Sequence, residues 1–234
     1  MKIGLFTDTH FTLCPPADRP YLSDAPDRVA EAMEHFSKER VDVIVCLGDF
    51  VDLGKNHAEE LNNWRIMLSI IRRYDIPFFI LPGNHDYEVL KGDEFCAVSG
   101  MPGFPFAVNV GDKRLIFLDA CYKKSGLRYD AGGMLWNDCS LPTEQIDFLK
   151  NTLSNADRNC IVFLHQDLDE SIDHDYLIAE HKTIKNLIAS SKKVKFVFSG
   201  HYHAGAECVS DGVRYITLPS MTESAKNEYR VFDI

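Results

Sequence analysis

The sequence has no pattern of paired cysteines. Its seven cysteines are an odd number, they are scattered along the chain, and no Cys-x-x-C motif occurs. We therefore expect neither a disulfide framework nor a cysteine-rich zinc site. Cys46 and Cys160 lie within apolar runs, where cysteine behaves as a small hydrophobic residue.

Long hydrophobic runs are also missing. No apolar stretch approaches the roughly 18 residues that a membrane span needs, so we expect no membrane association. Residues 1–7 already read as a strand. We therefore expect no signal peptide and a cytoplasmic protein. A length of 234 residues suits one domain, and we expect residues 1–234 to form one.

Positive charge is scarce. The chain has 25 Lys and Arg against 35 Asp and Glu, which gives a formal net charge of −10. A nucleic-acid-binding surface needs the opposite sign, and no Lys/Arg cluster is long enough to follow a phosphate backbone. We expect no such surface. An acidic protein that handles phosphates must supply positive charge locally, and bound metal ions do so.

The first half alternates short apolar runs with longer amphipathic stretches. Residues 2–7, 42–47 and 77–81 read as buried strands. Helical patterns lie between them, at about residues 24–40 and 57–74. This order predicts parallel strands joined by right-handed crossovers.

The second half predicts a mixed sheet. Residues 106–110 and 114–118 flank Gly111-Asp112, and residues 206–209 and 213–218 flank Asp211-Gly212; both patterns indicate hairpins. The remaining elements are helices at about 143–153 and 179–190 and strands at 160–164, 194–199 and 229–232. We expect the last strands to form a meander. Residues 88–103 and 120–141 read as irregular.

Five polar clusters follow expected strands. They are Asp8-Thr-His10, Gly48-Asp49-Phe-Val-Asp52, Gly83-Asn84-His85-Asp86, His165, and Gly200-His201-Tyr-His203. In open α/β sheets the site lies beyond the carboxyl ends of the strands, so all five clusters point to one place. Each consists of metal-ligand or acid/base residue types.

The spacing within two clusters suggests metal binding. Residues i and i+2 leaving a strand project to the same side, so Asp8 with His10, and His201 with His203, could each form a pincer. Ligation by Asp, His and Asn together suits Mn, Fe or Zn, whereas calcium prefers oxygen-only cages.

The ordered set D-x-H, G-D-x-x-D, G-N-H-D, a lone His and G-H-x-H resembles the calcineurin-like metallophosphoesterase superfamily. The match spans residues 8–203. The resemblance implies an α/β fold with two mixed β-sheets packed as a sandwich and flanked by helices. It also implies a metal-dependent phosphoric ester hydrolase.

The resemblance further implies a set of seven ligands for two divalent metal ions: Asp8, His10 and His203 for the first, Asn84, His165 and His201 for the second, and Asp49 as the bridge. His85 would be the catalytic acid beside the leaving group, and Asp52 would orient it. Two dications, two carboxylates and a bridging hydroxide leave a site charge of +1, which attracts a phosphate. The hydroxide would attack phosphorus directly.

The substrate implied by the resemblance is a small-molecule phosphodiester, pyrophosphate or phosphomonoester. The middle of the chain is most similar to compact bacterial phosphohydrolases and to manganese-dependent ADP-ribose/CDP-alcohol diphosphatases. Cyclic-nucleotide phosphodiesterase activity is the alternative. A non-catalytic scaffold of the same fold should have lost ligands, and this chain keeps all of them. A nuclease of the same fold would need a basic groove, and the sequence does not indicate one.

Specificity should come from the irregular segments, because functional residues concentrate on such loops. Tyr129 and Trp136 are our candidate substrate-binding residues, through stacking on a base. Basic residues that could hold a second phosphate are Arg19, Lys123, Lys124 and Arg128. We therefore expect a preference for a nucleotide-like diester or pyrophosphate over an alkyl monophosphate.

Other acidic residues could have a structural role in place of a role in the site. Asp119 ends an apolar strand and is either a hydrogen-bonded turn residue or part of the site lining. We expect the acidic run after His165 to be a solvated loop; it consists of Asp167, Asp169, Glu170, Asp173 and Asp175.

Overall fold

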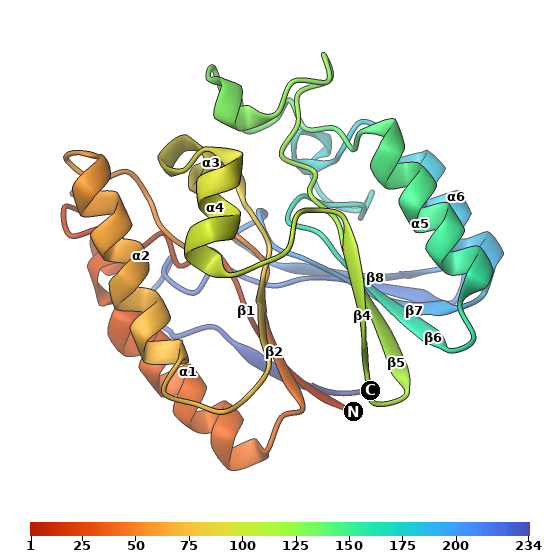
Figure 1. The fold of residues 1–234 in the computed structure, drawn as a ribbon, viewed down its shortest axis with the longest axis horizontal. Helices are drawn as coiled ribbons and strands as arrows, with labels where there is room; N and C mark the ends of the chain where they lie inside the picture. The colour runs from red at the N-terminus through yellow and green to blue at the C-terminus, as the bar shows by residue number, and fades with distance from the viewer.

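Two β-sheets face each other in the computed structural model of residues 1–234, and helices cover their outer sides (Figure 1). The first sheet has the order β10-β1-β2-β3 and consists of Arg230–Asp233, Lys2–Phe6, Val43–Cys46 and Phe78–Ile80. The second has the order β4-β5-β6-β7-β9-β8 and consists of Phe106–Val110, Lys113–Phe117, Asn159–Phe163, Val194–Ser199, Val213–Thr217 and Ala206–Ser210. Each sheet contains parallel and antiparallel pairs, which confirms the expected fold class.

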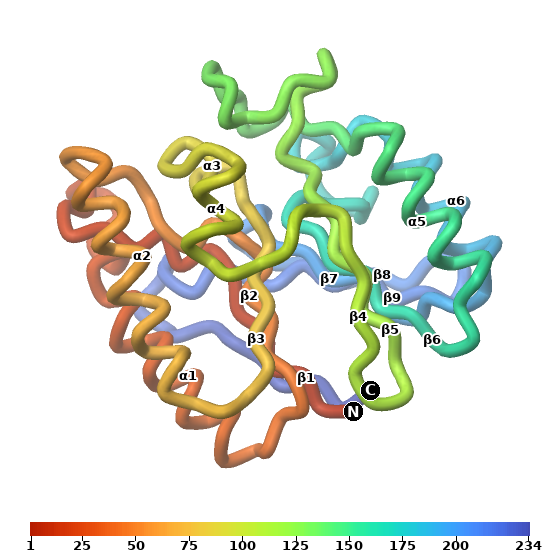
Figure 2. Tube along the Cα trace, in the orientation of Figure 1, coloured from red at the N-terminus to blue at the C-terminus, as the bar shows by residue number.

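The helices form two outer layers, which the trace in Figure 2 shows on opposite sides of the sheets. Helices α1 (Ala25–Glu39) and α2 (His57–Ile71) lie beside the first sheet, and α5 (Thr143–Asn155) and α6 (His181–Ser191) beside the second. The shorter helices α3 (Asn84–Val89) and α4 (Gly92–Ser99) follow β3. Three 3₁₀ turns complete the chain at Pro20–Asp24, Tyr129–Ala131 and His174–Tyr176.

Successive side chains of a strand point to opposite faces of the sheet, and this alternation produces two hydrophobic layers. Ile3 and Leu5 of β1 join a cluster that includes Phe163 and Phe198 of the opposite sheet, so this cluster fills the space between the sheets. Phe6 points to the other face and joins the cluster beneath the helices. Gly4 also faces that way, and a Cβ there would lie 2.8 Å from the Phe36 ring of α1, so helix packing requires glycine.

Two predictions about the fold are wrong. Residues 88–103 are not irregular, because they contain α4, whose Phe95 packs edge-on against Trp64 of α2. With eight residues, α4 is too short to produce a clear hydrophobic period. The chain also does not end in a meander, because β10 leaves the second sheet and pairs with β1.

Both expected hairpins are confirmed. Strands β4 and β5 pair with Val110 opposite Lys113, and β8 and β9 pair with Ser210 opposite Val213. In the second hairpin Asp211 and Gly212 have φ of 53° and 77°. A two-residue turn with both φ values positive matches the twist of the flanking strands.

The parallel strands β1, β2, β6 and β7 end at the same edge of the molecule, beneath the projecting residues 120–141 at the top of Figure 1. The two termini lie at the opposite edge (Figure 1), where the Met1 amino group donates to the Ile234 carbonyl at 2.8 Å. None of the helices is both long and apolar enough to cross a membrane.

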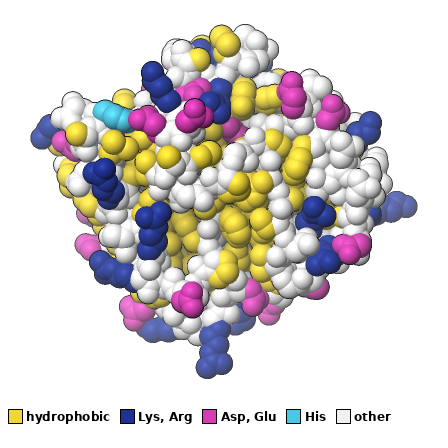
Figure 3. All heavy atoms as spheres, in the orientation of Figure 1, with side chains coloured by type: hydrophobic (Ala, Val, Ile, Leu, Met, Phe, Trp, Pro, Cys, Tyr) yellow, Lys and Arg dark blue, Asp and Glu magenta, His cyan; other side chains and the backbone are white.

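The surface in Figure 3 carries charges of both signs. Lys and Arg side chains are scattered among Asp and Glu around a hydrophobic band in the middle of this face, and they do not gather into a basic track. The band lies between β3 and β4 in the view of Figure 1, where Phe106 of β4 contacts Phe79 of β3 and Phe104.

Asp119, just after β5, is a buried and hydrogen-bonded turn residue. It accepts bonds from the Tyr87 hydroxyl at 2.8 Å and from the Cys121 backbone N–H at 2.9 Å. The Gln145 amide also donates to its carbonyl. Of the two interpretations left open by the sequence, these contacts favour the turn.

Asp119→Asn should reduce the pH dependence of stability. Burial raises the pKa of Asp119 from 3.8 to about 6, so the folded state binds this proton more tightly than the unfolded chain. The resulting stabilisation is full below pH 3.8 and is lost as the pH rises through about 6. Asn cannot ionise, so the variant should lack this loss. Urea denaturation at a series of pH values measures it.

The control is Asp147→Asn, at an exposed site on α5, which should keep the wild-type pH profile. If Asp119→Asn showed the same fall in free energy of unfolding as wild type across this window, the buried carboxyl would not be its source.

Candidate metal centre and active site

The loops after β1, β2 and β7 bend sharply at the candidate ligands. Four of them have left-handed backbone conformations, with φ of 51° at Asp8, 43° at His10, 52° at Asp49 and 65° at His201. Such values are rare for residues other than glycine and tend to mark functional sites. The expected pincers assumed extended backbone at these positions, and that assumption is wrong. The side chains converge because the chain turns.

The first cluster consists of Asp8, His10 and His203. Asp8 Oδ1 lies 3.6 Å from His10 Nε2 and 3.4 Å from His203 Nε2, and the two imidazole nitrogens are 3.2 Å apart. Three ligand-type atoms from two loops therefore face one small space.

The second cluster consists of Asp49, His165 and His201, with Asn84 beside it. His165 Nε2 is 3.3 Å from both Asp49 Oδ2 and Asn84 Oδ1, while its Nδ1–H donates to the Leu47 carbonyl at 2.8 Å. That bond fixes the ring orientation and leaves Nε2 available as a ligand. His201 and His203 thus belong to different clusters and form no pincer of their own.

Asp49 lies between the clusters. Its Oδ2 is 3.6 Å from His10 Nε2 on one side and 3.3 Å from His165 Nε2 on the other. Its Oδ1 accepts a bond from the His85 backbone N–H at 2.8 Å. This is the position that a bridging carboxylate would need.

Divalent metal ions fit the residues that are present. Asp8 Oδ1 and His201 Nε2 are buried and have no hydrogen-bond partner within the chain. An unsatisfied buried carboxylate oxygen is costly unless a cation or donor compensates it. The two His/Asp clusters, with these two orphan atoms, are consistent with a site for two divalent ions, and their mixed N and O donors exclude none of Mn, Fe and Zn.

His85 and Asp52 lie at the rim of this centre. His85 Nδ1 pairs with Asp52 Oδ1 at 3.1 Å, and the His85 ring packs edge-on against His10 with centroids 4.7 Å apart. Asp52 Oδ2 is also 3.5 Å from His10 Nδ1. Asp52 therefore orients the His85 ring and leaves its Nε2 free of this pair, whereas His10 Nδ1 has no hydrogen-bond partner.

The charges around the centre shift its pKa values strongly. Burial lowers the pKa of His85, but the nearby Asp49 and the bond to Asp52 outweigh it and raise the pKa to about 9. Burial and the neighbouring His165 lower the pKa of His201 to about 3. These shifts favour the doubly protonated form of His85 and the neutral form of His201 at neutral pH.

Two buried carboxylates outside the ligand set hold the loops together. Asp86 accepts bonds from the backbone of Phe50 and Gly83, both at 2.9 Å. Asp167 accepts from the hydroxyls of Ser199 at 2.9 Å and Thr217 at 2.8 Å, which ties the loop after β6 to β7 and β9. The expectation that Asp167 and Asp169 are solvated is wrong, since both are buried; Glu170, Asp173 and Asp175 are exposed as expected.

Glu223 is a further site residue that the sequence did not indicate. Its Oε2 accepts from His203 Nδ1 at 2.9 Å. This pairing leaves His203 Nε2 directed at Asp8 and His10. Metal-binding histidines commonly donate their other ring N–H to a carboxylate, which fixes the orientation of the ring. Glu223 is on the loop after β9, and buried Arg28 of α1 secures that loop by donating to the Met221 carbonyl at 2.6 Å. Nothing in the local sequence marks Glu223 as a partner of His203.

An aromatic wall stands beside His201. The Trp136 and Tyr176 rings are 4.9 Å apart, and both lie within 6 Å of the His201 ring. Tyr202 packs edge-on against Tyr176. Together with the ligands they line a cavity of about 430 Å³. Tyr176 and Tyr202 were not predicted, although Tyr202 lies between the two histidines of the last motif.

Tyr129 does not belong to that wall. It is 1% exposed, and its hydroxyl donates to the Asp138 carbonyl at 3.1 Å. Its ring is part of the hydrophobic core and cannot stack on a substrate, so the assignment of Tyr129 as substrate-binding needs correction. Trp136 is 41% exposed and lines the cavity with His201 and His203.

The basic residues considered for a second phosphate are largely committed elsewhere. Arg128 donates two bonds to Asp130 at 3.0 and 2.8 Å. Lys123 donates to the Gly132 carbonyl, and Arg19 lies 3.6 Å from Asp52 Oδ2. These pairings do not favour a second phosphate subsite.

Comparison with known proteins yields relatives with phosphodiesterase names. The chain is 23% identical to a protein of Fibrobacter succinogenes named "Probable cyclic nucleotide phosphodiesterase", over 87% of this chain and 73% of that protein. It is also 23% identical to one of Arcobacter nitrofigilis named "Probable glycerophosphodiester phosphodiesterase", over 82% of this chain and 68% of that protein.

Among solved structures, a dimetal phosphatase from Danio rerio has the same fold, with a TM-score of 0.83 at 16% identity. The alignment covers 98% of this chain and 91% of that one. The family description "Calcineurin-like phosphoesterase" matches residues 1–205. The chain therefore belongs to the calcineurin-like phosphoesterase family of metal-dependent hydrolases.

Proposed function

We propose that this enzyme hydrolyses small-molecule phosphodiesters at a two-metal site held by Asp8, His10, Asp49, Asn84, His165, His201 and His203. The observation that carries the proposal is the position of Asp49, whose Oδ2 faces a histidine of each cluster. Mn, Fe and Zn are the candidate ions because the donors mix imidazole, carboxylate and amide groups.

The bound ions would polarise the phosphoryl group and lower the pKa of water. The chain itself supplies the proton for the other half of the reaction. His85 would hold a proton on Nε2, fixed by the bond between its Nδ1 and Asp52, and donate it to the leaving oxygen.

A diester is favoured over a monoester because the cavity over the ligands offers a surface for a second ester group besides the candidate acid His85. The aromatic wall of Trp136, Tyr176 and Tyr202 lies beside His201, and His85 lines the same cavity. The wall suits a base or another flat group that remains on the phosphate. The names of the two relatives agree with phosphodiester chemistry.

Cyclic-nucleotide hydrolysis is the second candidate, and the name of the Fibrobacter succinogenes relative favours it. In a cyclic nucleotide both ester oxygens belong to one sugar, so the base would contact the aromatic wall while the sugar oxygen faced His85. Comparing a cyclic nucleotide with an open diester of the same nucleoside separates the two candidates. A strong preference for the cyclic substrate would make it the primary assignment.

Asp49→Ala should lower metal content more than any other single ligand change, because it removes the only side chain that faces both clusters. We expect wild type loaded with Mn²⁺ to retain about two ions per chain, and the variant at most half of that. Elemental analysis after gel filtration measures both. Asp147→Ala on the exposed face of α5 should retain the wild-type content. Wild-type protein that retained no metal would contradict the proposed site.

His85→Asn should keep the metal content but reduce kcat by ~10²–10⁴ for diesters with poor leaving groups, the usual range for loss of a general acid. The loss should shrink when p-nitrophenolate leaves, because this group departs without a proton. Asp52→Asn should show a milder form of the same pattern. Equal losses for good and poor leaving groups would rule out an acid role.

Trp136→Ala should raise KM about tenfold for the p-nitrophenyl ester of thymidine 5′-phosphate, within the range of one lost stacking contact. Methyl p-nitrophenyl phosphate has the same leaving group but no base, so its KM should stay near the wild-type value. Trp136→Phe should preserve binding of the thymidine ester. An equal change in KM for both substrates would show that Trp136 shapes the centre and does not contact the retained group.

A further inference from the structure

The loop of residues 219–227, which follows β9, connects the two segments that carry the first metal cluster. The Ser220 hydroxyl donates to the Asp8 carbonyl at 2.9 Å, and the Ser220 backbone N–H donates to the His203 carbonyl at 3.0 Å. The Thr222 hydroxyl also donates to the Asp8 carbonyl, at 3.2 Å. The 219–227 loop therefore fixes the backbone of Asp8 relative to that of His203.

Helix α1 anchors this loop on both sides of Glu223. Buried Arg28 reaches from the helix, and its Nη1 donates to the loop carbonyls of Met221, Ser224 and Lys226 at 2.6, 2.7 and 3.1 Å. Because the carbonyls before and after Glu223 are bound to one rigid side chain, the Glu223 backbone has little freedom to move away from the metal centre.

The Glu223 side chain uses this fixed position to hold the His203 ring. Its Oε2 accepts the bond from His203 Nδ1 at 2.9 Å, and it lines the cavity over the ligands as a half-exposed group. With the proton on Nδ1, the lone pair of Nε2 is free to bind a metal ion, and this Nε2 lies 3.4 Å from Asp8 Oδ1. A carboxylate partner also makes an imidazole a more basic ligand.

The other ligand histidines have different partners at Nδ1. That of His165, in the second cluster, donates to the neutral Leu47 carbonyl at 2.8 Å, and that of His10 has no hydrogen-bond partner. A change at Glu223 should therefore act on the first metal position and spare the second.

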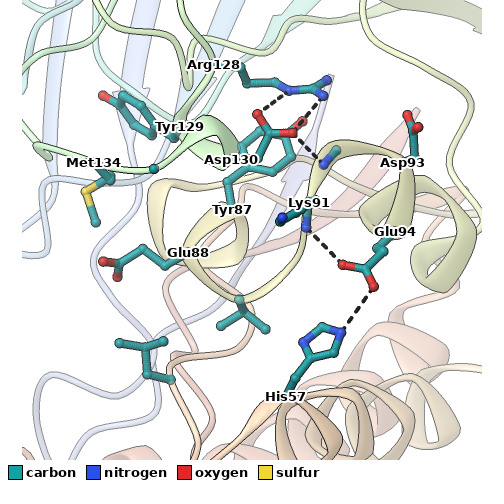
Figure 4. Close-up of a pocket in the computed structure, with 15 residues that line it drawn as sticks. His57, Tyr87, Glu88, Lys91, Asp93, Glu94, Arg128, Tyr129, Asp130 and Met134 are labelled. Carbon is teal, nitrogen blue, oxygen red and sulfur yellow. Dashed lines mark hydrogen bonds and ion pairs between the residues drawn. The ribbon is translucent and has the colours of Figure 1, made fainter.

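Carboxylates of the neighbouring cavity do not share this role. That cavity, of about 650 Å³, lies beside α3 (Figure 4). Its Glu94 lies 3.1 Å from His57, and its Asp130 accepts bonds from Arg128. Its Glu88 lies 3.6 Å from His85 Nδ1, and His85 is the candidate acid, not a ligand. These carboxylates are therefore paired with groups outside the ligand set.

We infer that Glu223, held in place by the 219–227 loop, is a positioning residue for the first metal ion and sets the affinity of that position. The inference rests on the proposed two-metal site and not on the choice of substrate. The 219–227 loop follows residues 1–205, which the family description matches, so the family assignment does not account for it.

Titration of metal-free protein with Mn²⁺ tests this role without any substrate. Free aqueous Mn²⁺ is measured by its electron paramagnetic resonance signal, which gives a Kd for each bound ion. Glu223→Gln keeps an acceptor but loses the charge, and it should raise one of the two Kd values about tenfold. Glu223→Ala loses the acceptor as well and should raise the same Kd further, up to ~100-fold. The other Kd should stay at the wild-type value in both variants.

Glu228→Gln is the matched control, because it makes the same change next to the loop at a carboxylate that pairs with Lys226 at 2.6 Å. It should keep both wild-type Kd values. Anomalous scattering from Glu223→Gln crystals at limiting Mn²⁺ identifies the weakened position. The peak beside Asp8, His10 and His203 should lose occupancy relative to the peak beside His165.

Failure of this inference and failure of the proposed function give different results. Unchanged Kd values in both Glu223 variants, or equal weakening of both ions, would overturn the positioning role and leave the two-metal site in place. Wild-type protein that bound no Mn²⁺ would overturn both proposals. Two bound ions with the expected Glu223 effect, but no hydrolysis of diesters, would support the positioning role and overturn the proposed substrate class.

Discussion

One carboxylate oxygen of Asp49 lies 3.3 Å from His165 Nε2 and 3.6 Å from His10 Nε2, while the other accepts a bond from the His85 backbone. This single side chain thus links both histidine clusters to the loop that carries the candidate acid. A Cβ on Gly83 would lie within 2.7 Å of the Asp49 carboxylate carbon, so that loop can approach only because position 83 is glycine. The spacing of the whole centre depends on this contact.

Such convergence has a conformational cost that the rest of the fold must offset. Left-handed backbone at Asp8, His10, Asp49 and His201 costs on the order of 1 kcal/mol or more at each residue. The loops stay in place because buried polar groups hold them, among them Asp86 beneath the loop after β2 and Asp167 between β6, β7 and β9. The hydrophobic layer between the sheets fixes the strands from which these loops leave. Rigid strands and strained loop ends together keep the ligands close, and hydrogen bonds between distant loops, such as His165 with Asn84 and the His201 backbone N–H with Asp8, add to this.

Much of this arrangement follows from the sequence, and the exceptions have physical reasons. Short apolar runs followed by Asp, His or Asn mark strand ends, and parallel strands bring those ends together, so the ligand candidates could be found. The α4 helix is too short for a periodic signal, and the pairing of β10 with β1 depends on contacts more than 200 residues apart. Burial of Asp167 depends on hydroxyls from two other strands. Glu223 and Tyr176 reach the site from distant loops, and no local pattern identifies them.

The placement of two ions on either side of Asp49 is the claim on which the rest of the account depends. Anomalous scattering from crystals of the Mn²⁺-loaded protein measures it directly. The account predicts two peaks about 3.5–4 Å apart, one against Asp8, His10 and His203 and one against Asn84, His165 and His201, with Asp49 touching both. A single peak that Asp49 does not contact, or peaks only at other side chains, would contradict it.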